Sequence, residues 1–229
     1  MAGIPSHMMR LNLPQRPMLV VELTDPIRGV LVAGDMRVTA EGYRPPTVTP
    51  SNRFVWPDRD PPKARRIRLK AESTNGMFAP FDALVDVPAN VVGVPASDIT
   101  VAHVLEPTGL YQPPPGMIAV GGMLVEDAGP PQAVAGVRIR IHFSQAEGME
   151  PFTSPRAAVT DRNGAFMAVT GPLEARPDPD PKRPGTFEAR LTLARGDEVR
   201  VKALSLRPGR LFRIPAPVEW AALQPPEEQ

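Results

Sequence analysis

The sequence predicts an all-β fold with two tandem, small antiparallel β-sandwich domains, a proline-rich linker and extended termini. Of the 229 residues, 31 are proline, and proline lacks the backbone N–H that helices and central strands need. Apolar residues alternate with polar ones over short stretches, which is the period of a half-buried strand. Turn residues separate these stretches roughly every ten residues, as they do in all-β sandwiches.

An ordered internal repeat indicates that the two domains are copies of one module. Three segments return in the same order: Val32–Gly42 as Val134–Gly148, Thr49–Trp56 as Thr160–Met167 with a one-residue gap before the phenylalanine, and Pro57–Lys63 as Pro177–Lys182. An ordered series rarely recurs by chance, and an internal repeat defines the unit of folding. The chain has no cysteine, so each unit must fold on its hydrophobic core alone.

The first domain is predicted over residues 18–88, behind an extended arm over residues 1–17. Its clearest strand signal is the alternation of Met36, Val38 and Ala40 with polar residues. Short aliphatic or aromatic runs bounded by Gly, Pro and Asp indicate the others. The expected strands are Met18–Leu23, Met36–Glu41, Phe54–Trp56, a stretch around Ile67 and Leu69, and Phe81–Val87.

A proline-rich linker is predicted over residues 89–116. It contains Asp98–Leu105, which suits either a strand or a short helix, and it ends with Pro113–Gly116. Consecutive prolines are stiff, so the linker should hold the two domains at a semi-rigid separation.

The second domain is predicted over residues 117–217. Asn163-Gly164 predicts a hairpin between the strands on either side, because both residues tolerate positive φ. Gly196-Asp197 predicts another tight turn. Residues 218–229 should form a polar tail with one apolar anchor, Trp220. The expected strands are Met117–Val125, Val137–Phe143, Arg156–Val159, Ala165–Val169, Phe187–Leu193 and Val199–Leu204.

Three motifs of the second domain carry a family resemblance. Gly121–Val125 is a small opening strand, Ala135–Ile139 reads "aGv-x-v", and Thr160–Phe166 reads "TD-x-x-G-x-F". In this order they resemble the carboxypeptidase regulatory-like, or transthyretin-like, β-sandwich family. The resemblance implies an accessory or structural module without an active site. The first copy keeps Ala33-Gly34, Thr49, Asn52 and Phe54, but it lacks the Asp and the Gly of the turn.

The charge and hydropathy of the chain exclude several partners. Its formal net charge is +1, from 26 basic and 25 acidic residues, so no strong attraction to nucleic acid or to an anionic membrane is expected. No apolar run reaches the roughly 20 residues that cross a bilayer. Met1–Pro17 is interrupted by prolines and does not resemble a secretory signal peptide. These features favour a virion or a cytoplasmic assembly, without insertion into a membrane.

One stretch of the first domain is locally basic. In the strand around Ile67 and Leu69, the side chains of Arg66, Arg68 and Lys70 share the opposite face. The favoured interpretation is a solvated strand face over a core. The alternative is a phosphate-binding stripe.

The histidines and tyrosines do not predict a metal centre. His7, His103 and His142 do not form the closely spaced pairs that are usual in metal sites. The intradiol dioxygenases, which resemble this sandwich type, bind iron through two tyrosines and two histidines. Tyr43 and Tyr111 would complete such a set, but the near-paired histidines of that family are missing. No catalytic, cofactor-binding or metal-binding residue is therefore predicted.

Three other motifs have a structural interpretation that outweighs a functional one. Arg195-Gly196-Asp197 matches an adhesion tripeptide but suits a tight turn between strands. Pro57–Asp60 and Pro177–Asp180 each offer two carboxylates, which is too few for a calcium site, so rigid loops are expected. The chain has neither the nucleophile elbow of a serine hydrolase nor a phosphate loop.

The sequence therefore favours a non-enzymatic structural or assembly protein, such as a component of a phage tail, baseplate or contractile apparatus. Apolar residues in the terminal arms, such as Met8, Leu11, Leu13 and Trp220, would bury on neighbouring subunits as the arms fold, and the protein would form a homo-oligomer in the assembly. The alternative is a surface-exposed module for adhesion, or for recognition of carbohydrate or protein, through loops at the ends of the sandwiches. An enzyme is the least favoured class.

Overall fold

The computed structural model describes residues 17–57, 65–88, 92–127, 129–145, 149–154, 156–170, 177–180 and 182–226. Within these ranges the protein is all-β, as predicted: its strands form several mostly antiparallel sheets, and its helical elements are two 3₁₀ turns. In the same ranges no helix is long and apolar enough to cross a membrane. The predicted N-terminal arm lies outside the described residues, apart from Pro17, which begins the first strand.

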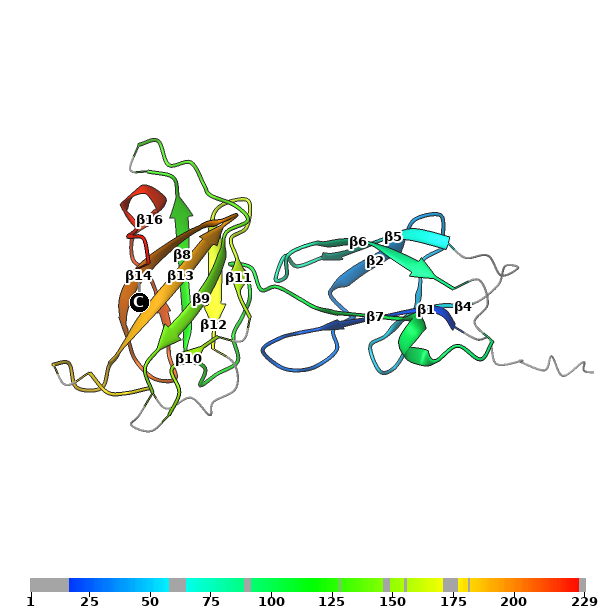
Figure 1. The fold of residues 1–229 in the computed structure, drawn as a ribbon, viewed down its shortest axis with the longest axis horizontal. Coiled ribbons are helices and arrows are strands. Elements are labelled where there is room, and N and C mark those ends of the chain that lie inside the picture. Colours follow the sequence, from blue (N-terminus) through cyan, green and yellow to red (C-terminus); the bar gives the residue numbers. More distant parts are fainter. Residues whose placement is uncertain are drawn as a thin grey trace, which may run out of the picture.

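Two sheets enclose a first hydrophobic core (Figure 1). One sheet has the order β3-β4-β1-β7 and the other the order β2-β5-β6. Every second residue of β2 is buried, as its alternating sequence predicts. The first strands are β1 (Pro17–Thr24), β2 (Met36–Ala40), β3 (Thr47–Val48), β4 (Phe54–Pro57), β5 (Arg65–Ser73), β6 (Phe81–Val87) and β7 (Thr100–Val104), the last preceded by η1 (Ala96–Ile99).

A second pair of sheets encloses a second core. One has the order β10-β9-β13-β14, with β11 also paired to β9, and the other has the order β12-β8-β15, with β16 also paired to β8. The elements are β8 (Ala119–Val125), β9 (Arg138–Phe143), β10 (Phe152–Thr153), β11 (Ala158–Val159), β12 (Ala165–Val169), β13 (Phe187–Arg195), β14 (Glu198–Leu206), β15 (Leu211–Arg213), β16 (Val218–Glu219) and η2 (Trp220–Ala222). The predicted hairpin at Gly196-Asp197 is confirmed as the β13–β14 turn.

The two units have the same strand connections. In the first, β1 pairs antiparallel with β4 and parallel with β7, while β5 pairs with both β2 and β6. In the second, β8 pairs antiparallel with β12 and parallel with β15, while β13 pairs with both β9 and β14. The order and the sense of these pairings therefore match for β1, β2, β4, β5, β6 and β7 against β8, β9, β12, β13, β14 and β15, whereas β3, β10, β11 and β16 lie outside this match.

The turn before β4 and the turn before β12 have equivalent hydrogen bonds. The amide of Asn52 donates to the carbonyl of Thr49, as the amide of Gly164 does to the carbonyl of Asp161. The Thr49 hydroxyl accepts from the amide of Arg53 at 3.1 Å, where the Asp161 carboxylate accepts from Ala165 at 3.0 Å. Asn52 and Gly164 both have positive φ, 59° and 75°. In their hydrogen bonds Thr49 is equivalent to Asp161, so an alignment of these two turns needs no gap.

The hairpin predicted around Asn163-Gly164 is wrong. β11, before the turn, pairs with β9, and β12, after it, pairs with β8 in the facing sheet. The turn therefore connects two sheets. Its geometry also differs from the expected one, because only Gly164 has positive φ. A three-residue loop of this kind closes on a glycine in the left-handed region.

The stretch predicted as a linker supplies a strand to the first unit. β7 pairs in parallel with β1 over five residue pairs, from Val20 opposite Thr100 to Thr24 opposite Val104. The strand alternative for Asp98–Leu105 is thus the better one, with the short turn η1 before it. The connection between the units is correspondingly shorter than residues 89–116.

The predicted C-terminal tail packs on its own unit. Val218 of β16 lies opposite Leu124 of β8, and Trp220 and Leu223 are 4% and 7% exposed within the second core. Gln224 also bridges to Val201. These residues pack within the second unit, so the side chain of Trp220 is not available as a contact for a neighbouring subunit.

Candidate functional site

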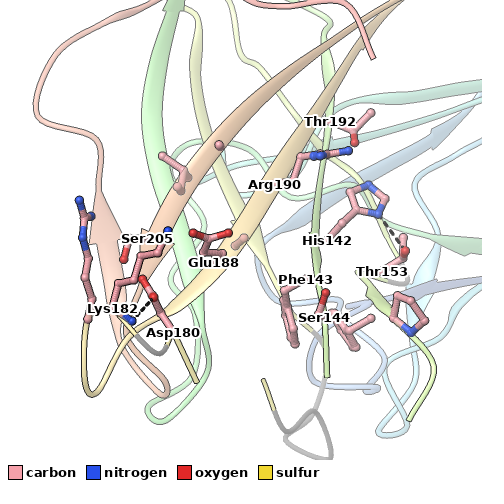
Figure 2. A pocket seen from close by; sticks show the side chains of 16 residues that line it. His142, Phe143, Ser144, Thr153, Asp180, Lys182, Glu188, Arg190, Thr192 and Ser205 are labelled. Carbon is pink, nitrogen blue, oxygen red and sulfur yellow. Dashed lines mark hydrogen bonds between the residues drawn. The ribbon is translucent and has the colours of Figure 1, made fainter. Parts of the chain in front are cut away.

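A groove of about 910 Å³ lies on the outer face of the β10-β9-β13-β14 sheet (Figure 2). Polar side chains from the strands form its floor, and the segment before β13 forms one rim. The polar residues of its lining are His142, Ser144, Thr153, Asp180, Lys182, Arg183, Glu188, Arg190, Thr192 and Ser205, among the residues that the structure describes.

Strand alternation places the floor residues on one face. In β9, Ile139, Ile141 and Phe143 are buried in the core, so His142 points outward between them. In β13 the buried residues alternate with Glu188, Arg190 and Thr192 in the same way. The pairing register of the strands then determines which of these outward residues are neighbours.

Cross-strand pairing brings residues of three strands together. Arg190 lies opposite both His142 and Ala203, and Glu188 lies opposite Ser205. His142 and Ser205 are therefore on either side of β13, as Figure 2 shows.

His142 has one ring nitrogen in a hydrogen bond and one without. Its Nδ1 lies 2.8 Å from the Thr153 hydroxyl. Its Nε2 is buried, and so is the Ser205 hydroxyl; the structure gives neither atom a hydrogen-bond partner among the residues it describes. Burial lowers the pKa of His142, and the neighbouring charges of Arg140 and Arg190 lower it further. The ring is therefore neutral at pH 7.

A folded loop places two cations at the rim. Asp180 is 8% exposed, and its carboxylate accepts a hydrogen bond from the amide of Lys182 at 2.8 Å. The amide of Arg183 donates to the Asp180 carbonyl, and the amide of Asp180 donates to the carbonyl of Thr186. The side chains of Lys182 and Arg183 are exposed and line the groove. Asp180 thus organises the loop through these hydrogen bonds.

The residues considered for metal binding do not converge. His103 stacks on Phe81, with ring centroids 3.9 Å apart, and Tyr111 donates from its hydroxyl to Asp25. Tyr43 packs against the first core, whereas His142 lies in the groove of the second unit. Among the described residues there is no group of three or more His, Asp or Glu side chains that could hold a metal ion. His7, Asp58 and Asp60 lie outside these residues.

The basic stretch of the first unit faces solvent and is paired with acidic residues. Arg68 Nε donates to Asp82 at 2.8 Å, and Arg66 lies 3.8 Å from Asp86. Lys70 reaches the second oxygen of Asp82 at 4.0 Å. The hydrogen bond from Arg68 lowers the pKa of Asp82. These pairings favour the solvated strand face over a phosphate-binding stripe.

The Arg195-Gly196-Asp197 motif forms the β13–β14 turn, in which Gly196 has a φ of 59°. Arg195 Nη1 lies 3.0 and 2.9 Å from the two carboxylate oxygens of Glu126. Its guanidinium also lies 5.8 Å from the ring centroid of Trp220. The arginine is engaged within the chain, which supports the structural interpretation.

The sequence reasoning missed the groove. It considered His142 only as a possible metal ligand, and it singled out neither Thr153 nor Ser205. The available signal was the alternation in β9 and in the β13–β14 hairpin, which together put their polar residues on one face.

Comparison with known proteins gives no family for the chain: no protein-family model matches it, and no curated protein does either. The resemblance of the second domain to transthyretin-like sandwiches therefore stays a prediction.

Proposed function

We propose that this chain is a non-enzymatic structural component of a larger assembly, built from two copies of one transthyretin-like sandwich module. The matching strand connections of the two units support the duplication. The equivalent turns at Thr49 and Asp161 support it further, because in both turns a side-chain oxygen accepts a hydrogen bond from the backbone amide four residues later.

The observation that carries this proposal is the bonded connection between the units. The Tyr111 hydroxyl donates to Asp25 of the first unit, at 3.0 Å from each carboxylate oxygen. The amide of Thr108 donates to the carbonyl of Met77 at 2.9 Å, and the carbonyl of Pro107 accepts from Val159 of the second unit at 2.9 Å. A connecting segment that is hydrogen-bonded to both units is typical of a rigid spacer and not of a flexible tether.

Apolar packing reinforces this connection. The first core continues through Tyr111 to Ala119, Met167 and Val169, which belong to β8 and β12 of the second unit. A junction that buries apolar side chains resists bending, because bending would expose them to water. A tail, baseplate or contractile apparatus needs subunits whose domains keep a fixed spacing. We propose that the chain belongs to an assembly of this kind, in a virion or in the cytoplasm.

The test uses the N-terminal arm, since the C-terminal residues pack on their own unit. Replacing Met8, Met9, Leu11 and Leu13 with serine in the full chain should leave both units folded, because β1 begins only at Pro17. It should abolish entry into the assembly, measured by co-sedimentation with particles from the native host. The control replaces Ser6, Asn12 and Gln15 with alanine. Equal entry of the serine variant and the wild type would refute the role of the arm.

A surface binding module is the second candidate, and the groove on the second unit favours it. Buried polar atoms without partners are uncommon in folded proteins, and His142 and Ser205, which each carry such an atom, both line the groove. Binding of a ligand by the isolated chain, without assembly, would favour this candidate.

A further inference from the structure

We propose that the outer edge of β6 binds residues 9–13 of a second copy of this chain as an added strand. The inference rests on the proposed role in an assembly and deepens it, because it names the surface that receives the N-terminal arm. Three observations carry it: the side chains along β6, the contrast with the equivalent strand β14, and the sequence of the arm.

The edge of β6 leaves part of the first core uncovered. In the order β2-β5-β6 this strand pairs with β5, and it has no second neighbour among the described residues. Phe81, Ala83 and Val85 lie opposite buried residues of β5, so they share the face that points toward the core. All three are nevertheless only partly buried. A further strand beside β6 would cover them.

The edge of β14, which holds the same place in the second unit, is protected. Its core-side positions include Arg200 and Lys202, which lie opposite buried leucines of β13. Inward-pointing charges keep an edge strand from pairing with another chain. The C-terminal segment also pairs there, since the amide of Val201 donates to the carbonyl of Gln224 at 2.8 Å. Phe81, Ala83 and Val85 give β6 an apolar core side instead, which is typical of an edge that accepts a strand.

The sequence of the arm suits this edge. Met9, Leu11 and Leu13 alternate with Arg10 and Asn12, which is the period of a strand with one apolar side. Beside β6, that apolar side would cover the partly buried residues of the core. Main-chain hydrogen bonds would join the two strands, as they do when a peptide extends a sheet.

The charges on the outer face of β6 favour the arm over a second β6. Asp82 and Asp86 lie on this face, and the side chain of Asp86 is 86% exposed. Two β6 strands paired antiparallel around Leu84 would place these aspartates opposite each other, and like charges directly opposite are destabilising. If Asn12 of the arm lies opposite Leu84, Arg10 lies opposite an aspartate. That aspartate is Asp82 in a parallel pairing and Asp86 in an antiparallel one.

The length of the arm favours a second copy over the same chain. The ring of Phe81 stacks on that of His103, with centroids 3.9 Å apart, so β6 faces β7, the neighbour of β1. A strand added beside β6 would lie about 14 Å from β1, two strand spacings aside and one sheet spacing away. The chain from Leu13 to Pro17, where β1 begins, spans at most about 14 Å. The arm would reach its own β6 only along a straight line, whereas the arm of a second copy has no such limit.

Disulfide trapping tests the pairing, because the chain has no cysteine of its own. Two full-length variants, Asn12→Cys and Leu84→Cys, are mixed in a glutathione redox buffer, and a purification tag on one of them identifies mixed dimers. In the proposed register the two Cα atoms are as close as those of paired strands, which a disulfide can bridge. We expect a disulfide-linked mixed dimer on a non-reducing gel.

The matched control uses another edge strand. Val48→Cys replaces Leu84→Cys, since Val48 is an exposed aliphatic residue of β3, at the edge of the facing sheet. The yield of mixed dimer should be about tenfold lower, because a disulfide requires Cα atoms within roughly 7 Å.

Two further substitutions test the two faces of the added strand. Ala83→Lys copies Lys202 of β14, since both residues lie opposite a buried leucine. In the Leu84→Cys variant it should lower the yield about tenfold, because an inward charge blocks an edge. Ala203→Lys makes the same change on the outer face of β14 and should leave the yield unchanged. Circular dichroism checks that each variant is folded.

The second substitution, Arg10→Glu, lies in the arm, before either unit begins. It would place a carboxylate opposite Asp82 or Asp86, and in the Asn12→Cys variant it should lower the yield about threefold. Arg16→Glu makes the same change of charge outside residues 9–13 and should have no such effect.

Several outcomes would overturn the inference. These are no mixed dimer, equal yields with Leu84→Cys and Val48→Cys, equal yields with Ala83→Lys and Ala203→Lys, or equal yields with Arg10→Glu and Arg16→Glu. Dimers of Leu84→Cys with itself, in place of mixed dimers, would show that two β6 edges pair with each other. A chain that carries both Asn12→Cys and Leu84→Cys and closes the disulfide within itself would show that the arm folds back on its own unit.

The same variants separate this inference from the proposed function. If no mixed dimer forms but the serine variant of the arm fails to enter the assembly, the arm docks elsewhere. The inference then fails, while the structural role stands. If the mixed dimer forms through β6 but the serine variant enters the assembly as the wild type does, the role of the arm in the assembly fails. The edge of β6 then remains a contact between two copies of the chain.

Discussion

Replacing Tyr111 with phenylalanine should weaken the junction between the units. Tyr111 is 2% exposed and Asp25 is 3% exposed, so water cannot easily replace the lost hydroxyl. The ring remains, and with it the contact with Phe78 at a centroid distance of 5.5 Å. The variant therefore removes one hydrogen bond and little packing.

The size of the expected loss of stability follows from the interactions that the Asp25 carboxylate keeps in the variant. Its Oδ1 still accepts from the amides of Ile27 at 2.8 Å and Arg28 at 3.1 Å. Among the described residues, its Oδ2 then keeps the Arg28 guanidinium, at 3.8 Å. A hydrogen bond to a charged group contributes about 1.5–3 kcal/mol, so we expect the free energy of unfolding of the first unit to fall by about 2 kcal/mol. In urea this lowers the midpoint by about 1 M.

The two tryptophans allow the units to be followed separately. Trp56 belongs to the first core and Trp220 to the second. Labelling with 5-fluorotryptophan gives one fluorine signal for each, and urea titration then gives one transition for each unit. The Trp56 transition should move to lower urea. A change of less than about 0.5 kcal/mol at Trp56 would contradict the reasoning, because it lies below the range for a charged hydrogen bond.

The phenol also predicts a pH dependence. Burial and the charge of Asp25 raise the pKa of Tyr111 well above its ordinary value of 10.0. The folded state therefore holds this proton more tightly than the unfolded chain does. The resulting stability is fully present below pH 10 and is lost as the pH rises further. The wild type should lose stability above pH 10 more steeply than Tyr111→Phe; parallel profiles would refute this assignment.

The remaining predictions concern a turn, the C-terminal segment and a histidine. Gly164→Ala should cost at least about 2 kcal/mol more in urea unfolding than Gly136→Ala, since both glycines have φ near 75° but only at Gly164 would a Cβ lie 2.2 Å from the Leu124 carbonyl oxygen; equal costs would refute the steric argument. Trp220→Ala should lower the free energy of unfolding of the second unit by about 3–5 kcal/mol, measured by circular dichroism. If Trp220 belonged to an arm that is free to bind partners, the substitution would leave this free energy unchanged. Burial lowers the pKa of His103 below 6.5, so stability should fall as pH drops through 6.5, and His103→Gln should flatten that slope in urea unfolding.

Local patterns predicted the strands but not all of their partners. Alternation located β2 and β9, and Gly196-Asp197 located the β13–β14 hairpin, because these signals arise within a few residues. Asp161–Gly164 did form a turn, yet the sheet that each flanking strand joins depends on distant residues. β7 and β16 pair in parallel with strands far along the chain, and no local signal marks such pairings.

Residue identities pair Thr49 with Thr160, whereas the hydrogen bonds of the two turns pair Thr49 with Asp161. Thr49 and Thr160 are the same type of residue. What the two turns share, however, is a side-chain oxygen that accepts a hydrogen bond from a backbone N–H, at Thr49 in one and at Asp161 in the other. Threonine and aspartate both supply one. Asn52 likewise replaces Gly164 because asparagine tolerates positive φ better than other side chains do.

The candidate groove could not be predicted because its residues come together only through sheet pairing. His142 and Thr153 are joined by the β9–β10 pairing, and Ser205 approaches through β13 and β14. The sequence provided the outward direction of each side chain, but not the order β10-β9-β13-β14 that makes one surface of them.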